Sequence, residues 1–132
     1  MSERAHKKRH ERKVDKAIER KRVIRCVKRF QRACPDKVRI VARTVIGMKV
    51  GDATNYLKFG ITKASRVLGL CLKSAIDNAI MVFGKEVDDL FVKGIMVDRG
   101  PMLKRIHPVS HGMAKHILKR TCHVTVVVSD KG

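Results

Sequence analysis

The chain has few aromatic residues and no tryptophan. Only 4% of its 132 residues are aromatic, namely four Phe and one Tyr. Proteins that read single-stranded nucleic acid mainly by stacking its bases depend on aromatic side chains as platforms. The composition therefore argues against that class of protein and favours recognition through phosphate contacts and shape.

Cysteine patterns and long apolar runs are also missing. Cys26, Cys34, Cys71 and Cys122 form no CxxC pair and have no regular spacing, so neither a zinc site nor a disulfide framework is indicated. We expect reduced, mostly buried thiols. No apolar run approaches the roughly 18 residues of a membrane span, and no P-loop, dinucleotide or nucleophile-elbow pattern occurs. We therefore expect no membrane partner, no cofactor and no metal.

Positive charge is what the chain has in excess. It contains 31 Lys and Arg against 12 Asp and Glu, a net charge of +19. The excess is uneven: residues 1–32 carry 14 basic and 4 acidic side chains (+10), residues 33–98 carry 10 and 7 (+3), and residues 99–123 carry 6 and none (+6). Such a balance makes nucleic acid the expected partner, bound mainly outside the central part of the chain.

The acid-free segment 99–123 lies between two strand-like runs, Leu90–Val97 and Val124–Val128. Two such runs with a basic connection predict one long β-hairpin. Arms of about ten residues would carry its middle about 30 Å from the rest of the domain. Gly100 and Pro101 predict a bend or bulge in the outgoing arm. Because an isolated ribbon is marginal in water, we expect an anionic partner to order it.

The segment before the hairpin is predicted to contain one strand followed by helices. A first strand is predicted over about Cys26–Ala33. Pro35 is typical of a first helical position, and apolar residues at helical spacing predict a helix that Gly47 ends. A shorter helix is predicted over Asp52–Phe59, closed by Gly60.

A third and longer helix is predicted from Thr62, as its N-cap, to Gly84. Its main apolar face contains Ala64, Val67, Leu68, Cys71, Ala75, Ala79 and Val82. A second apolar stripe contains Leu70, Leu72, Ile76 and Ile80, so we expect both sides to be covered. This order of elements predicts an α+β fold, with helices on a small antiparallel sheet.

The chain divides into a basic extension and one domain. Residues 1–24 have too little apolar content to join a core, so we expect them to be disordered without RNA. Their four acidic residues argue against a mitochondrial transit peptide. Residues 25–132 form the single domain, including an extended hairpin over about residues 90–128.

Three separated motifs carry a family resemblance: KSAIDNA at 73–79, VDRGPMLKRIHP at 97–108 and ILKRTCHVTVVVSD at 117–130. Over about three quarters of its length the chain resembles large-subunit ribosomal protein family twenty-two, whose hairpin lines the peptide exit tunnel. The resemblance implies three helices packed on a three-stranded antiparallel sheet, with a long protruding β-hairpin. It also implies a non-enzymatic structural role in subunit assembly. Implied partners are large-subunit ribosomal RNA, neighbouring large-subunit ribosomal proteins and the nascent peptide passing the hairpin tip.

Charge and resemblance together select the candidate site residues. The expected RNA-binding residues are Arg29, Arg32, Lys37, Arg99, Lys104, Arg105, Lys115, Lys119, Arg120 and His123. The expected tunnel tip consists of Val109, Ser110, His111, Gly112 and Met113. Family tips usually read like PRAKGRA where this chain has PVSHGMA, and the helix start often reads SPRK where this chain has CPDK. The expected location is a cytoplasmic ribosome of bacterial type, with an organellar ribosome as the alternative.

Two other classes of function remain open at this point. A free architectural protein could grip a DNA groove with a basic β-ribbon. His107, His111 and His116 could in principle perform acid and base steps in RNA cleavage or hold a metal. Both of the latter roles need a fixed geometry, which a tip without a walled pocket does not supply.

Overall fold

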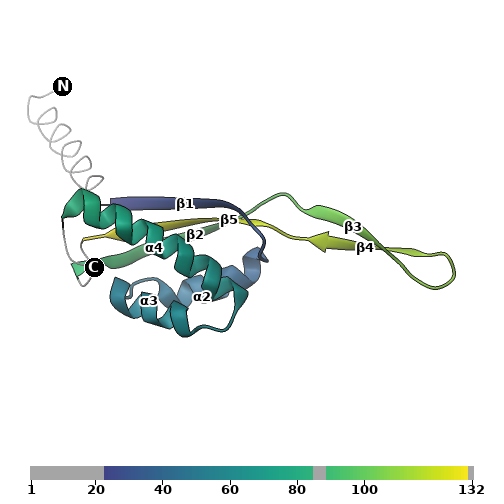
Figure 1. Cartoon of the computed structure of the whole chain (residues 1–132), viewed down its shortest axis with the longest axis horizontal. Coiled ribbons are helices and arrows are strands. Elements are labelled where there is room, and N and C mark those ends of the chain that lie inside the picture. Colours follow the sequence, from purple (N-terminus) through teal and green to yellow (C-terminus); the bar gives the residue numbers. More distant parts are fainter. Residues whose placement is uncertain (1–22, 85–88, 131–132) are drawn as a thin grey trace, which may run out of the picture.

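A computed structural model describes residues 23–84 and 89–130 (Figure 1). Its elements are β1 (Val23–Gln31), α2 (Pro35–Val45), α3 (Val50–Phe59), α4 (Lys63–Phe83), β2 (Phe91–Arg99), β3 (Leu103–Pro108), β4 (Ala114–Lys119) and β5 (Cys122–Ser129). No helix among the described residues has both the length and the apolar character needed to cross a membrane. The N-terminal extension lies almost wholly outside the described residues, so its disorder stays a prediction.

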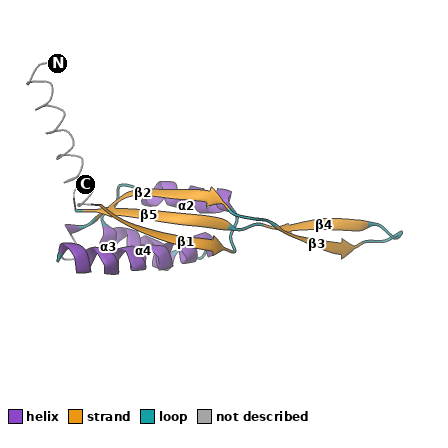
Figure 2. Ribbon diagram, turned by 90° about the horizontal axis from the view of Figure 1, so that it is seen from above, coloured by secondary structure: helices purple, strands orange, loops and turns teal. Residues whose placement is uncertain are grey.

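Strands β1, β5 and β2 form an antiparallel sheet with β5 in the centre. The three helices of the described residues lie on one face of this sheet (Figure 2). Alternate residues of a strand point to opposite faces, and Val124, Val126 and Val128 of β5 are fully buried in the core. The predicted α+β fold, with three helices on a three-stranded antiparallel sheet, is confirmed.

Local sequence signals place most helix ends correctly. Pro35 begins α2 and Gly84 follows the last residue of α4, as predicted. The Thr62 hydroxyl oxygen accepts a hydrogen bond from the Ser65 N–H (3.1 Å), the usual N-cap interaction. Helix α3 begins at Val50, earlier than predicted, because the Val50 N–H donates to the Leu90 carbonyl (2.9 Å) and this long-range bond orders the chain before the helix.

Other sequence predictions are wrong in detail. The first strand is Val23–Gln31 rather than Cys26–Ala33, because its ends are set by pairing with β5 and not by its own residues. The second apolar stripe of α4 is only half covered: Leu72 and Ile76 are buried, whereas Leu70 and Ile80 are exposed. Val82, predicted on the buried face, is exposed as well. The sheet, α2 and α3 surround only part of α4, so the rest of its circumference faces outward.

The outer hairpin forms a separate two-stranded sheet of β3 and β4, which protrudes from the body (Figures 1 and 2). We call residues 101–120 the ribbon; every one of them is exposed. The outgoing arm is interrupted between Arg99 and Leu103, at the predicted bend of Gly100 and Pro101. The expected hairpin is therefore two ladders in series, of which the inner one belongs to the body.

Replacing residues 104–116 with a short turn should leave the fold intact, because these exposed side chains bury nothing in the core. We expect the thermal midpoint, measured by circular dichroism, to stay within a few degrees of the parent. The comparison variant Leu68→Ala removes a fully buried side chain and should cost about 2–5 kcal/mol. Global unfolding of the deletion variant would show that the ribbon stabilises the body.

Candidate nucleic-acid interface

An open groove of about 1020 Å³ lies where the ribbon meets the body, between the starts of α2 and α4 and the end of β4. Five cations line it: Arg32, Lys37, Lys63, Lys119 and Arg120. Its apolar lining is Ala33, Ile40, Val41, Ala64 and Leu118, and none of its described lining residues is acidic. Helix N-termini carry a partial positive charge. The groove thus combines five cations with two helix starts, a combination suited to phosphate groups.

The groove brings together four residues predicted from the sequence: Arg32, Lys37, Lys119 and Arg120. Lys63 was not predicted. It follows the N-cap Thr62, but the sequence contains no sign that the starts of two helices meet beside the ribbon. The groove forms only when separate segments of the chain pack together in the fold.

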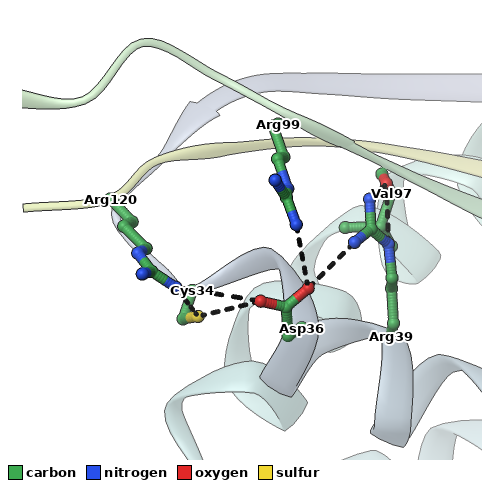
Figure 3. A network of polar contacts seen from close by, with 6 residues as sticks. All are labelled: Cys34, Asp36, Arg39, Val97, Arg99 and Arg120. Carbon is green, nitrogen blue, oxygen red and sulfur yellow. Dashed lines mark hydrogen bonds and ion pairs between the residues drawn. The ribbon is translucent and has the colours of Figure 1, made fainter.

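Asp36, in the first turn of α2, organises the junction of body and ribbon (Figure 3). Its Oδ1 accepts a hydrogen bond from Nη1 of Arg39 (2.9 Å). The same guanidinium donates from Nε (3.2 Å) and Nη2 (2.8 Å) to the carbonyl of Val97 in β2. These charge-assisted bonds tie the start of α2 to the strand that leads into the ribbon.

Two more arginines approach the same carboxylate from the two arms of the hairpin. Arg99 Nη2 lies 3.9 Å from Asp36 Oδ1, and Arg120 Nη1 lies 3.8 Å from Oδ2. All three side chains are at least half exposed, so each pair contributes little stability. Their effect is on orientation: the carboxylate lets guanidinium groups from both arms converge at the base of the ribbon. Asp36 of the CPDK segment thus contacts guanidinium groups of Arg39, Arg99 and Arg120.

The two arms are held close together at the junction. The Gly100 N–H donates to the Thr121 carbonyl (3.0 Å), and the Thr121 hydroxyl donates to the Pro101 carbonyl (2.6 Å). A Cβ atom on Gly100 would collide with the Thr121 hydroxyl, so this approach requires glycine. The link fixes where the ribbon leaves the body.

His123, predicted to bind RNA, is engaged within the fold. Its Nδ1 accepts a hydrogen bond from the Phe30 N–H (3.0 Å), and the two rings meet edge to face with centroids 4.8 Å apart. Phe30 lies at the bulge that ends β1 and has a positive φ of 54°. Nδ1 of His123 is therefore engaged by the Phe30 backbone and is not free to contact RNA.

The register of the ribbon gives it two unlike faces. Paired residues of an antiparallel ladder share a face. From the pairing, one face carries Leu103, Arg105, His107, Lys115, Ile117 and Lys119, and the other carries Lys104, Ile106, Pro108, Ala114, His116 and Leu118. Four of the predicted RNA-binding cations lie in the β3–β4 ladder. Three of them, Arg105, Lys115 and Lys119, share one face, and the opposite face is mainly apolar. Arg29 lies on β1 and Arg99 at the junction, both outside the groove lining.

The tip is a tight turn with apolar flanks. The Val109 N–H donates to the Met113 carbonyl (2.8 Å), and His111 and Gly112 have positive φ values of 62° and 69°. Val109, Met113 and the residues between them are exposed. In the part of the chain that the structure describes, no three His, Cys, Asp or Glu side chains are grouped so as to hold a metal.

Cys34 differs from the buried cysteines in its electrostatic environment. The backbone N–H groups of Asp36 and Lys37 at the start of α2, together with Arg120 Nη1 at 3.8 Å, hold the pKa of its thiol below the usual value. Burial raises the pKa of Cys71 to about 12 and also raises the pKa of Cys122. Cys34 lines the groove, so its thiol can report on whether the groove is occupied.

Comparison with known proteins gives consistent matches. The family model described as ribosomal protein L22p/L17e matches residues 26–129. A large ribosomal subunit protein uL22 from Syntrophobacter fumaroxidans is 44% identical over 108 residues, which cover 82% of this chain and 98% of that protein. A uL22 protein from Solidesulfovibrio magneticus is 40% identical over 106 residues, covering 80% and 96%. The matched span contains the groove, the junction and the whole ribbon.

Cys34 should be the first cysteine to react with iodoacetamide at neutral pH, because a lowered pKa increases the thiolate fraction. We expect its alkylation, followed by peptide mass mapping, to be roughly tenfold or more faster than that of Cys71. Cys34→Ser should abolish the fast phase. A fast phase that survives in this variant would contradict the assignment.

Proposed function

This chain belongs to the ribosomal protein L22p/L17e family, and from that premise we propose that it binds large-subunit ribosomal RNA through the basic groove and the ribbon. It is a structural component of the ribosome and not an enzyme. The observation that carries the RNA proposal is the groove itself: five cations and two helix starts meet there, and none of its described lining residues is acidic. We further propose that the ribbon's tip lines the peptide exit tunnel.

The groove supports binding to a phosphate backbone. Each cation that neutralises a phosphate releases condensed counterions, which drives association at moderate salt. The apolar lining formed by Ala33, Ile40, Val41, Ala64 and Leu118 suits the less polar sugar edges between phosphates. Recognition then depends on the shape of folded RNA, which agrees with the scarcity of aromatic residues.

The ribbon supports a second contact with RNA, which would support assembly by joining separate RNA segments. Its cationic face, with Arg105, Lys115 and Lys119, suits phosphates, and its mainly apolar face suits neighbouring ribosomal proteins or RNA sugars. Two-stranded ribbons are marginal alone, so we propose that the assembled subunit stabilises it. Both relatives are bacterial, which favours a cytoplasmic ribosome of bacterial type.

The tip suits a passage wall better than a phosphate contact. Val109 and Met113 are exposed, and the arginines that family tips carry at these places are absent here. Apolar side chains gain nothing from phosphate oxygens. We propose that the tip faces the nascent peptide while cations at the ribbon's base, Lys104, Lys119 and Arg120, position the ribbon on RNA.

The double variant Lys37→Glu/Lys63→Glu should weaken binding to a large-subunit RNA transcript more than a matched change elsewhere. The matched control is Lys49→Glu/Lys93→Glu, which alters net charge equally at exposed residues outside the groove lining. In titrations over a range of salt, each lost phosphate contact should reduce the log–log slope by about 0.7 to 0.9. Equal effects of the two double variants would mean that net charge, and not the groove, directs binding.

Replacing residues 109–113 with an Asn-Gly turn should leave subunit assembly intact, because the proposed positioning cations remain. The response of these ribosomes to macrolide antibiotics or to arrest peptides should change, measured by drug binding and by stalling on a reporter message. Failure to form large subunits, seen by sedimentation, would assign the tip to RNA packing. Normal assembly with unchanged tunnel responses would also contradict the tunnel assignment.

A further inference from the structure

The turn between α3 and α4 projects two large apolar side chains away from the protein. Phe59 is 81% exposed and Ile61 is 97% exposed, with Gly60 between them. We call these three residues the apolar hook. Single exposed apolar residues are ordinary, but the hook places two of them on one short turn, beside the groove. The turn is therefore a candidate site for a ligand.

The hook is held in place by its neighbours. The Gly60 N–H donates to the Tyr56 carbonyl (3.1 Å), and the Thr62 and Ser65 hydroxyls lie 2.8 Å apart. A Cβ atom on Gly60 would collide with the side chain of Ser65, so the turn packs directly against the first turn of α4. A turn fixed in this way loses little conformational entropy when it binds.

The position of the hook links it to the groove. Ile61 directly precedes Thr62 and Lys63, which line the groove, and the α3–α4 connection lies at the end of the body from which the ribbon leaves (Figure 1). A strand whose phosphates occupy the groove would therefore have its neighbouring nucleotides within reach of the hook.

The charge of the sequence on either side of the hook favours a polyanion over a protein surface. Residues 53–76 contain four cations, Lys58, Lys63, Arg66 and Lys73, and no Asp or Glu. An exposed apolar pair in a protein interface needs no such surrounding, whereas an acid-free basic segment attracts nucleic acid. In folded RNA, unpaired bases are the groups that offer flat, weakly polar faces.

We propose that the apolar hook binds an unpaired RNA base next to the groove, with Phe59 stacked on the base and Ile61 packed beside it. This deepens the proposed function and rests on it, because the groove must hold the strand. Every base has a stacking face, so the contact tolerates different bases. Phe59 is the most exposed of the chain's aromatic side chains, ahead of Phe30 (62%) and Tyr56 (46%), and is therefore the best placed of them to stack on a base.

Two short fluorescein-labelled strands test the proposal in fluorescence anisotropy titrations: an oligoadenylate and an abasic ribose-phosphate strand of equal length. The test variant is Phe59→Ser/Ile61→Ser. The matched control is Met81→Ser/Val82→Ser, which removes an exposed apolar pair from the other end of α4. Thermal midpoints should confirm that both variants are folded.

The hook variant should bind the oligoadenylate roughly 5- to 150-fold more weakly than the parent, the range measured for lost base stacking. Its binding to the abasic strand should be unchanged, the control variant should match the parent on both strands, and Phe59→Trp should retain tight binding. Unchanged binding of the hook variant to the oligoadenylate would overturn the proposal and assign the turn to a protein neighbour. Equal losses on both strands would also overturn it, since the effect would not depend on bases.

The same titrations separate this proposal from the one on which it rests. Lys37→Glu/Lys63→Glu should weaken binding to the abasic strand, because that strand keeps its phosphates. If it does and the hook variant behaves as the parent on both strands, the groove stands and the base contact fails. If the groove variant binds the abasic strand as the parent does, the groove proposal fails first.

Discussion

The burial of the central strand β5 is the constraint on which the rest of the molecule depends. β5 pairs with β1 on one side and β2 on the other, and its inward-facing valines are fully buried under the helices. It also follows directly from β4, the return arm of the ribbon. The apolar burial that stabilises the body therefore fixes the point and direction from which a fully exposed ribbon leaves it. The core thus determines where the ribbon lies, and residues outside the core determine the chemistry of its surface.

Self-repulsion is the second constraint, because a net charge of +19 opposes a compact state. The chain keeps residues 33–98 almost balanced (+3) and carries most of the surplus on either side of them, in residues 1–32 (+10) and 99–123 (+6). Asp36 is the local case: Arg39, Arg99 and Arg120 converge on it from three elements, within 2.9 to 3.9 Å. Without a carboxylate there, the guanidinium groups would separate, and the two arms of the hairpin would lose their shared contact with α2.

The sequence alone predicted those features that depend on residues close together in the chain. Pro35, Thr62 and Gly84 mark helix ends through their own backbone preferences, and the three-motif resemblance predicted the sheet and the ribbon. The ends of β1 and the early start of α3 were missed, because partner strands and a long-range hydrogen bond set them. Lys63 was missed for the same kind of reason, since only the packing of α2 and α4 beside β4 makes it part of a site. Positive charge in a sequence predicts a polyanionic partner, but not which cations share one groove.

Because the ribbon is exposed, the affinity that its contacts provide depends on the entropy cost of ordering it. Ordering a residue's backbone costs about 1–2 kcal/mol, and residues 101–120 bury no side chain in the body to offset that cost. The β3–β4 ladder of six residue pairs reduces the cost, because it restricts the two arms together and leaves fewer conformations to lose on binding. The junction bonds of Gly100 and Thr121 act in the same direction at the ribbon's base. A partner surface would then select among a few orientations of a nearly formed ribbon, so that more of the proposed phosphate interaction would appear as binding free energy.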